Sequence, residues 1–431
     1  MEGQMTLTVL TIAFIFFVVL GMPIAFAIGV SSMFALMTQD VPLILISHYM
    51  FSGVDSFVLC AIPMFVLAGE IMLYGGMTRS LTDLSDVLVG KIRGGLGHTN
   101  ILASIFFAGI TGSATADTTA IGSILIPAMS GKGYSRAYST AITIASSVIG
   151  PIIPPSLTFV IYALAVGNVS IGGLFLAGII PGILTGIGLM AINYIISRKR
   201  NYEKRSESYS WGEILKIVRQ SLVVIVMPLL IVVGVISGVY TATESAAAAS
   251  AYALVVCLLI FKTLKFSDLG KIFFNSAKVS SIMFLLLATS NLFSYVLATE
   301  NVPTLMAETL HNLTDNPIVF LLLLNIILLL IGCVVDLFPA IFIFAPIFAP
   351  VAYSYGISPL HFGLIFCVNL LVGLNTPPVG SGLFIGAAIG HVKLEELIRE
   401  VNPFIIMEFI ILLCITYIPA VTMIIPTLAG F

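Results

Sequence analysis

Long apolar runs constrain this chain more than any other feature of its sequence. A helix needs about 20 mostly apolar residues to cross the hydrocarbon core of a bilayer. Ten runs approach or reach this length: residues 5–21, 22–38, 56–76, 135–166, 171–197, 218–239, 242–262, 278–299, 358–390 and 403–428. Charged residues make up only 9% of the chain, whereas a soluble domain carries roughly 25%. We therefore predict an all-α polytopic membrane protein with about 10 membrane-spanning helices.

Two further apolar stretches, 94–131 and 317–353, are interrupted at their centres. Gly112–Asp117 breaks the first, and Cys333–Asp336 breaks the second. Each half is too short to cross a bilayer comfortably. We predict that each stretch is a re-entrant helical hairpin that enters and leaves on one side. Non-helical backbone is tolerated at such depth only where protein or a wet cavity surrounds it.

The positive charges predict the orientation of the spans, because cytoplasmic loops of membrane proteins are enriched in Lys and Arg. All 18 Lys and Arg residues fall in five segments that span counting places on one side: 77–93, 132–136, 198–219, 262–278 and 391–400. The opposite segments hold only acids, among them Asp40. We predict that both termini are periplasmic, that 94–131 opens to the cytoplasm and that 317–353 opens to the periplasm. The net charge of −2 excludes a basic surface for nucleic acid.

The two interrupted stretches belong to an internal repeat. An offset of 219 residues, which becomes 223 after the hairpins, aligns Asp117 with Asp336, Pro127 with Pro346, Gly150 with Gly373, and Pro154–Pro155 with Pro377–Pro378. The distribution of Lys and Arg predicts that the two halves have opposite orientations in the membrane. Inverted-topology repeats are a recurring architecture of secondary transporters, and their binding sites lie on broken helices near the midplane.

These observations predict two repeats joined by a cytoplasmic linker at 198–217. Repeat one, 1–197, comprises scaffold helices 5–38, an arm 40–54, a helix 56–76, the hairpin 94–131, a broken helix 135–166 and a helix 171–197. Repeat two, 218–431, comprises scaffold helices 218–262, an arm 263–277, a helix 278–299, the hairpin 317–353, a broken helix 358–390 and a helix 403–428. Both arms can equally be ordinary loops.

The binding chemistry is predicted at the two hairpin tips and at the breaks 149–156 and 373–380. Proline removes an amide donor and displaces the carbonyl one turn earlier, so a break contains carbonyls without helical partners. Free carbonyls and a few hydroxyls can form a cage for a desolvated Na⁺, and helix N-termini attract carboxylates. A Pro-Pro pair can also be a simple kink. Pairs at equivalent positions of two repeats favour paired cation sites.

The polar tip residues have two interpretations each. Asp117 is predicted to cap the second hairpin helix, because Asp is a favoured N-cap. Asp336 either caps its helix or contacts substrate or solvent. Ser113 and the neighbouring threonines either bond the preceding turn or bind an ion. The two aspartates could also form the catalytic pair of an intramembrane enzyme, but the repeat already explains their equivalence.

Other residues carry little chemistry. Glu70 and Glu408 lie close to predicted membrane surfaces, so we expect them at the interface, and Glu244 is expected to cap a helix. No nucleophilic triad, histidine metal cluster or phosphate-binding loop is apparent, so we predict that the chain is not an enzyme and has no ATP site. The single cysteines are predicted to be packing residues: Cys60, Cys257, Cys333, Cys367 and Cys414.

Four motifs resemble the large membrane (M) subunit of tripartite ATP-independent periplasmic (TRAP) transporters. They are GSATAD at 112–117, IIPPS at 152–156, GVYTATE at 238–244 and GLNTPPVG at 373–380. Ala242 stands where the family often has proline. The resemblance spans essentially the whole chain. It implies uptake of an organic acid, such as sialic acid or a C4-dicarboxylate, driven by two or more Na⁺ ions across the bacterial inner membrane.

The same resemblance implies partners and site residues. A periplasmic substrate-binding protein delivers the substrate, and a small membrane (Q) subunit, expected as a separate polypeptide, supports the scaffold. Family sodium sites map onto Ser113, Gly150, Ile153, Pro155, Gly332, Gly373, Thr376 and Val379. Substrate contacts are expected at Thr115, Ser156 and Asp336.

The leading hypothesis is an elevator-type Na⁺/organic-anion symporter. Its hairpin bundle would slide across a scaffold formed by 5–38, 171–197, 218–262 and 403–428. The alternative is a stand-alone symporter of similar fold that works without a binding protein.

Overall fold

The computed structural model of the chain describes residues 2–39, 41–202, 204 and 209–431. Asp40 and Arg205, which entered the predicted charge distribution, lie outside the described residues, as do parts of the predicted linker. Within the described ranges the chain is helical and contains no β-strand. The prediction of an all-α protein is confirmed.

The N-terminal half contains ten α-helices and one short 3₁₀-helix. They are α1 (Glu2–Val19), α2 (Ile24–Leu36), α3 (Ile44–Ser52), η1 (Phe57–Cys60), α4 (Ala61–Tyr74), α5 (Met77–Val89), α6 (Gly95–Thr111), α7 (Ala114–Gly131), α8 (Arg136–Ser147), α9 (Leu157–Val166) and α10 (Ile171–Lys199). The predicted hairpin is therefore the helix pair α6–α7, and the predicted broken helix is α8 and α9.

The C-terminal half contains ten further α-helices and one π-helical turn. They are α11 (Trp211–Ile236), α12 (Ala242–Val255), η2 (Val256–Ile260), α13 (Phe266–Thr299), α14 (Val302–Leu313), α15 (Pro317–Val334), α16 (Leu337–Ser354), α17 (Pro359–Leu374), α18 (Ser381–Gly390), α19 (Leu394–Tyr417) and α20 (Pro419–Leu428). The second hairpin is α15–α16, and the second broken helix is α17 and α18.

Among the described residues, seven helices are long and apolar enough to cross a membrane, or up to eight if the bent pair α19–α20 is one span. This is fewer than the about 10 predicted. The difference arises because several apolar helices, among them α2, α9 and α18, are too short to qualify. Two of the seven are α15 and α16, the halves of the second predicted hairpin, which were expected to be too short to cross. The molecule is a multi-span membrane protein.

Four elements differ from the predictions. The predicted arm 263–277 is not separate, because no glycine or proline between residues 271 and 299 ends the continuous helix α13. The predicted helix 403–428 begins nine residues earlier, at Leu394, and bends by 59° between α19 and α20. The predicted loops 77–93 and 300–316 contain the helices α5 and α14.

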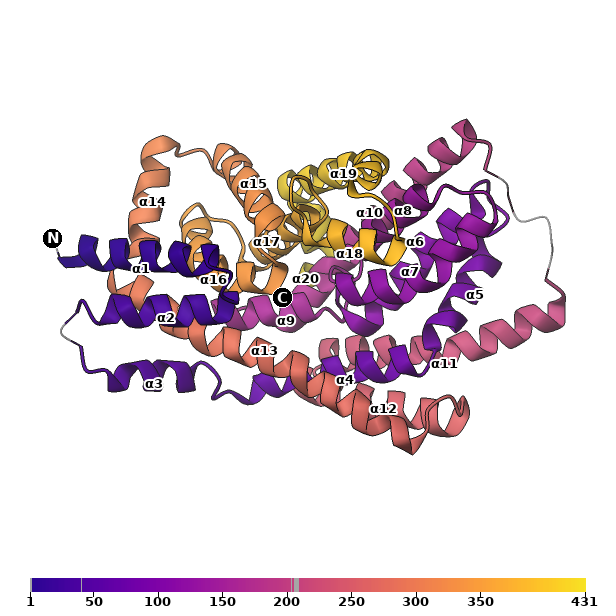
Figure 1. The fold of residues 1–431 in the computed structure, drawn as a ribbon, viewed down its shortest axis with the longest axis horizontal. Helices are drawn as coiled ribbons and strands as arrows, with labels where there is room; N and C mark the ends of the chain where they lie inside the picture. The colour runs from indigo at the N-terminus through magenta and orange to yellow at the C-terminus, as the bar shows by residue number, and fades with distance from the viewer. Residues whose placement is uncertain (1, 40, 203, 205–208) are drawn as a thin grey trace.

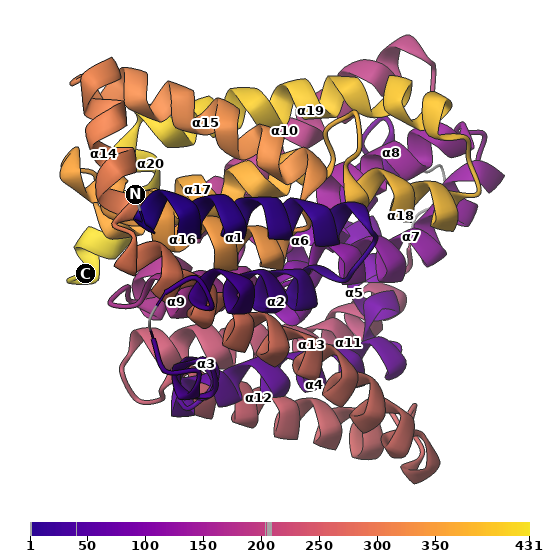
Figure 2. The same cartoon turned by 60° about the vertical axis from the view of Figure 1, so that its left-hand side comes forward.

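The helices pack into two groups, which lie along opposite sides of the molecule in Figure 2. In the first group, α1 and α2 pack together, α13 packs on α2, α3 and α4, and α12 packs on α4 and α11. The second group contains both hairpins, both broken helices, α10, α19 and α20. The helix α5 lies between them and packs on α6 and α11.

The helices α10 and α19 belong to the second helix group and not, as predicted, to the scaffold. Both were expected in the scaffold, but α10 packs mainly on α6, α17, α19 and α20, and α19 packs mainly on α8 and α10. Figure 1 shows α10 and α19 beside α8, α17 and α18, on the far side of the molecule from α12 and α13. A glycine allows α10 and α19 to approach closely, because a Cβ at Gly188 of α10 would lie 2.7 Å from the Ile411 Cδ1 of α19.

Candidate functional site

The tip of the first hairpin is a sharp turn between α6 and α7. Gly112 ends α6 with φ of 56°, in the left-handed region that favours glycine. A Cβ at this position would lie 2.7 Å from the Leu157 backbone nitrogen and 3.1 Å from the Pro155 carbonyl oxygen. Glycine therefore lets the tip rest directly on the break between α8 and α9.

Ser113 and Thr115 carry the hydroxyls of this tip. The Ser113 Oγ caps α7 by accepting from the Ala116 backbone N–H, and it lies 3.0 Å from the Thr115 Oγ1. Facing the tip, a Cβ at Gly150 would lie 3.8 Å from the Ser113 carbonyl oxygen. Ser113, Gly150 and Pro155, predicted to share a sodium site, are thus brought together by the fold.

The break between α8 and α9 is held by Ser156. Its Oγ accepts from the Phe159 backbone N–H at 3.2 Å, which caps α9, and donates to the Pro151 carbonyl. The Pro154–Pro155 bond within the break is cis. The Ile153 side chain packs against Gly182 of α10. The hydrogen bonds of Ser156 fix the non-helical backbone between the two half-helices.

The second tip and the second break are in direct backbone contact. A Cβ at Gly373 would lie 2.7 Å from the Gly332 Cα. The Gly380 N–H donates to the Cys333 carbonyl at 2.8 Å, and the Pro377–Pro378 bond is cis. Glycine on both sides allows the end of α15 to touch the end of α17.

Two further predicted ligands lie at this break. The Thr376 Oγ1 donates to the Val372 carbonyl at 2.7 Å, so its hydroxyl proton is engaged. Val379 is 42% exposed and sits beside Gly380. Gly332, Gly373 and Thr376 are therefore assembled at one place, with Val379 at its exposed edge.

Asn375 joins the second break to the first half of the chain. Its Nδ2 donates to the Ile144 carbonyl of α8 at 2.7 Å, and its side chain is buried. A Cβ at Gly382 would approach the Asn375 Oδ1 closely. One buried amide thus ties the second break to α8, the helix that precedes the first break.

A cavity of about 510 Å³ opens beside the first tip. Its polar wall consists of Ser113, Thr115 and Thr119 from α7 and Glu70 from α4. The apolar wall is made of side chains from α4, α9, α13, α16 and α18: Phe65, Val66, Leu73, Leu157, Val279, Met283, Phe338 and Ile385. Among the described residues that line it there is no lysine or arginine.

A second cavity of about 340 Å³ lies next to the first and contains Asp336. Val279, Met283 and Phe338 line both cavities, so these side chains form the partition between them. The Asp336 Oδ1 accepts from the Ser381 Oγ at 3.1 Å, and its carboxylate makes no capping hydrogen bond. Of the two interpretations of Asp336, the structure favours a cavity position over a helix cap.

The expected substrate contacts do not all meet in one place. Thr115 lines the larger cavity and Asp336 the smaller one. Ser156 is buried and lines neither, because both its donor and acceptor functions are used within the break.

The predicted capping role of Asp117 is wrong. Ser113 caps α7, and the Asp117 carboxylate, which is fully buried, accepts no hydrogen bond within the described residues. The reason is its register, because Asp117 lies one full turn into the helix, where the backbone N–H groups are already bonded to carbonyls.

Two glutamates that were expected at the membrane interface have different surroundings in the structure. Glu70 faces the larger cavity, where its Oε2 lies 3.4 Å from the Asn275 Nδ2 of α13. Glu408 is buried in α19 without a hydrogen-bond partner among the described residues. The signal for Glu70 was its place inside an apolar helix, where an ionisable residue indicates function by default.

The motifs and the helix order match a known transporter family. The family model for the tripartite ATP-independent periplasmic transporter, DctM component, matches residues 11–421. The chain belongs to this family. It is a large permease component of TRAP type, and members of this family are transport permeases, not enzymes.

Relatives of the permease match over nearly its whole length. YgiK of Salmonella typhimurium is 41% identical, and the match covers 96% of each chain. The sialic acid TRAP transporter large permease protein SiaM of Vibrio cholerae is 36% identical over 95% of each. The C4-dicarboxylate TRAP transporter large permease protein DctM of Pseudomonas aeruginosa is 37% identical and covers 88% of the permease and 89% of the relative.

A solved structure shares the fold of the permease. The Alcanivorax borkumensis YdaH transporter superposes with a TM-score of 0.63, covering 88% of the permease and 87% of that chain at 15% identity. This likeness concerns the fold alone. Membership of the TRAP family implies, in general, a periplasmic binding protein and a small permease subunit as partners.

Proposed function

We propose that the permease takes up an organic acid across the bacterial inner membrane by Na⁺-coupled symport, in an elevator mechanism. The observation that carries the proposal is the repeated contact between a hairpin tip and the break that contains a Pro-Pro pair, at Ser113/Gly150 and at Gly332/Gly373. A pair of equivalent tip-to-break contacts is the arrangement expected of two inverted repeats.

The cation sites are the two tip-to-break contacts. At the first, the Ser113 hydroxyl and the carbonyls of Gly150, Ile153 and Pro155 supply oxygen ligands. At the second contact, the oxygen ligands come from Gly332, Gly373, Thr376 and Val379. Carbonyl and hydroxyl oxygens are suitable ligands for a hard monovalent cation. We expect two or more Na⁺ ions to bind. A bound Na⁺ would bridge each tip to its break and so close the hairpin.

The substrate is a carboxylate held in the cavities beside the tips. Hydroxyls of Ser113 and Thr115 line the larger cavity, and hydroxyl donors can bind a carboxylate without a cationic side chain. The relatives named for sialic acid and C4-dicarboxylate transport support this substrate class. Asp336 is suited to hydroxyl or amine groups of the substrate, and Ser156 acts by holding the break.

The moving body is the second helix group. It contains every proposed site residue of the tips and breaks, and it includes α10 and α19. The first group, with α1, α2 and α11–α13, is the scaffold against which it slides. If two Na⁺ accompany a monovalent anion, one net charge crosses, and a potential of 100 mV contributes ~2.3 kcal/mol.

The partners follow from the family. A periplasmic binding protein delivers the acid, the small Q subunit packs on the scaffold, and both termini of the permease are periplasmic. Reconstitution of the permease with its small subunit and binding protein into proteoliposomes tests the proposal. We expect uptake that requires an inward Na⁺ gradient, and uptake indifferent to Na⁺ would contradict the coupling. Uptake by the permease alone would instead support a stand-alone symporter.

A further inference from the structure

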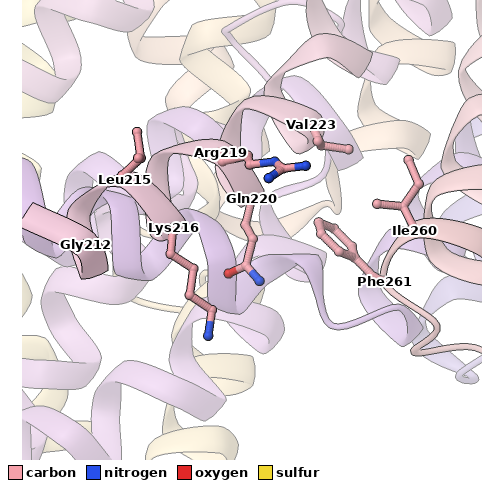
Figure 3. Close-up of a pocket in the computed structure, with 8 residues that line it drawn as sticks. All are labelled: Gly212, Leu215, Lys216, Arg219, Gln220, Val223, Ile260 and Phe261. Carbon is pink, nitrogen blue, oxygen red and sulfur yellow. The ribbon is translucent and has the colours of Figure 1, made fainter.

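A pocket of about 410 Å³ lies where the start of α11 meets the end of η2. It is remote in sequence from both tips and breaks. The side of the pocket formed by α11 consists of Gly212, Leu215, Lys216, Arg219, Gln220 and Val223. The opposite side consists of Ile260 and Phe261. Figure 3 shows Arg219 and Gln220 extending from α11 on the side that faces Phe261.

The polar part of this pocket is cationic. Lys216 and Arg219 are three residues apart, so they lie on one face of the helix. In the part of the chain that the structure describes, neither forms an ion pair or a hydrogen bond. The Glu213 carboxylate on the same helix is occupied at the capping box, where it accepts from the Ser210 N–H and Oγ. Two cations thus share a pocket without a counter-charge from the described residues.

The remainder of the pocket is apolar and open to the outside of the bundle. Leu215 is 71% exposed and Ile260 is 55% exposed. Beneath them, the Tyr252 hydroxyl donates to the Val223 carbonyl at 2.7 Å and so joins α12 to α11. Both elements that form the pocket belong to membrane spans. The pocket therefore lies at one end of two spans, with an apolar wall leading toward the hydrocarbon.

We propose that this pocket binds an anionic phospholipid of the cytoplasmic leaflet. Its phosphate would be paired with Lys216 and Arg219, and its glycerol and upper acyl chains would lie along Leu215, Val223 and Ile260. Basic pockets between membrane helices on the cytoplasmic side are suited to anionic headgroups. A free phosphate ion would use the cations but not the apolar wall, so the combination points to a lipid.

The test measures lipid binding to the permease purified together with its small subunit. Native mass spectrometry is performed with phosphatidylglycerol, with phosphatidylcholine of the same acyl chains, and with inorganic phosphate. We expect phosphatidylglycerol to bind in preference to the other two. The double variant Lys216→Gln/Arg219→Gln should bind phosphatidylglycerol about 30-fold more weakly, given roughly 1 kcal/mol for each of the two basic residues near an anionic surface.

A matched control removes the same charges elsewhere. Lys393→Gln/Arg399→Gln changes the lysine that directly precedes α19 and an arginine on α19, outside the pocket and on the predicted cytoplasmic side. It should bind phosphatidylglycerol like the wild type. Circular dichroism melting of each variant in detergent verifies that the fold is retained.

Four outcomes would overturn the proposal. They are equal binding of both lipids, displacement of phosphatidylglycerol by inorganic phosphate alone, equal loss of lipid in both double variants, and release of the small subunit in place of the lipid. The last result would assign the pocket to the subunit interface. Because the readout is lipid binding and not uptake, its failure is distinguishable from failure of Na⁺ coupling.

Discussion

At the scale of single residues, the proposed sites depend on glycines that allow backbone to touch backbone. The contact between Gly332 and Gly373 has no room for a side chain on either partner. Both are buried in helix ends, with no positive φ, so the requirement is space and not backbone conformation. A methyl group here would separate the second tip from its break.

We predict that Gly373→Ala lowers Na⁺-driven uptake strongly. The new Cβ would lie 2.7 Å from the Gly332 Cα, and relieving such overpacking costs about 1–3 kcal/mol. Initial uptake rates at varied Na⁺ concentration should show a higher Na⁺ requirement. Gly270→Ala is the control, because its Cβ meets nothing within 4 Å. Wild-type Na⁺ dependence in Gly373→Ala would exclude this contact as a cation site.

A second residue-scale prediction concerns the hydroxyl of Thr115. Thr115 is exposed to the larger cavity, whereas the neighbouring Thr119 Oγ1 already donates to the Thr115 carbonyl at 2.8 Å. We expect Thr115→Val to raise the uptake KM by about 2- to 12-fold, the equivalent of one net hydrogen bond of 0.5–1.5 kcal/mol.

Thr119→Val is the matched comparison for this hydroxyl. It removes the same group from the same wall of the cavity but should change KM little. If Thr119→Val raised KM and Thr115→Val did not, the substrate would lie deeper along α7 than proposed.

At the scale of elements, buried amides connect the second hairpin to its surroundings. The Asn369 Nδ2 of α17 donates to the Asn325 Oδ1 of α15 at 2.6 Å, and the Asn325 Nδ2 donates to the Thr416 Oγ1 of α19 at 3.1 Å. In an apolar environment an unpaired amide is costly. This chain of hydrogen bonds therefore makes three helices a single rigid unit.

We predict that Asn325→Leu and Asn369→Leu each destabilise the permease by about 1–3 kcal/mol, because each removes a buried hydrogen bond between the two amides. The double variant should lose less than the sum of the two, since both amides are then absent. Thermal unfolding of the purified protein, followed by circular dichroism, measures the three changes. Strict additivity would mean that the two side chains act independently.

At the scale of the whole molecule, the two helix groups are the units that an elevator would move. Several direct helix contacts join them. One is between α6 and α11, where a Cβ at Gly109 would lie 2.7 Å from the Pro228 Cβ. A covalent bond at this point would prevent sliding, whereas a bond within one group would not.

We predict that oxidation of the double variant Gly109→Cys/Pro228→Cys abolishes uptake and that a reductant restores it. The variants are made after Cys60 and Cys414, which are not buried, are replaced by serine. Disulfides need a Cβ separation near 4 Å, which a small shift provides. The control pair Gly29→Cys/Thr289→Cys joins α2 to α13 within one group, where a Cβ at Gly29 would lie 3.4 Å from the Thr289 Cβ.

In the control pair, oxidation should leave uptake unchanged. Equal loss of uptake in both oxidised pairs would show general damage. Full uptake by the oxidised Gly109→Cys/Pro228→Cys variant would contradict sliding at this interface.

Much of the helical pattern was accessible from the sequence because its signals are local. The interruptions at 112–117 and 333–336 predicted two re-entrant hairpins, and the structure places a helix on each side of both interruptions, in α6–α7 and α15–α16. The breaks at 149–156 and 373–380 lie between the half-helices as predicted. The predicted helix boundaries are wrong where a helix continues past its apolar run, as in α13 and α19. Hydrophobicity indicates which part of a helix lies in the bilayer and does not indicate where the helix ends.

The sequence by itself determined that the chain is an all-helical membrane protein with two interrupted hairpins, because apolar length and glycine or proline breaks are properties of short segments. Only the tertiary structure decided which helices form each group, which break each tip touches, and that Glu70 and Asp336 face neighbouring cavities. In a chain where nearly every helix is apolar, polarity does not distinguish the faces that pack together. Small residues and single buried amides make that choice, and their partners lie far away in sequence.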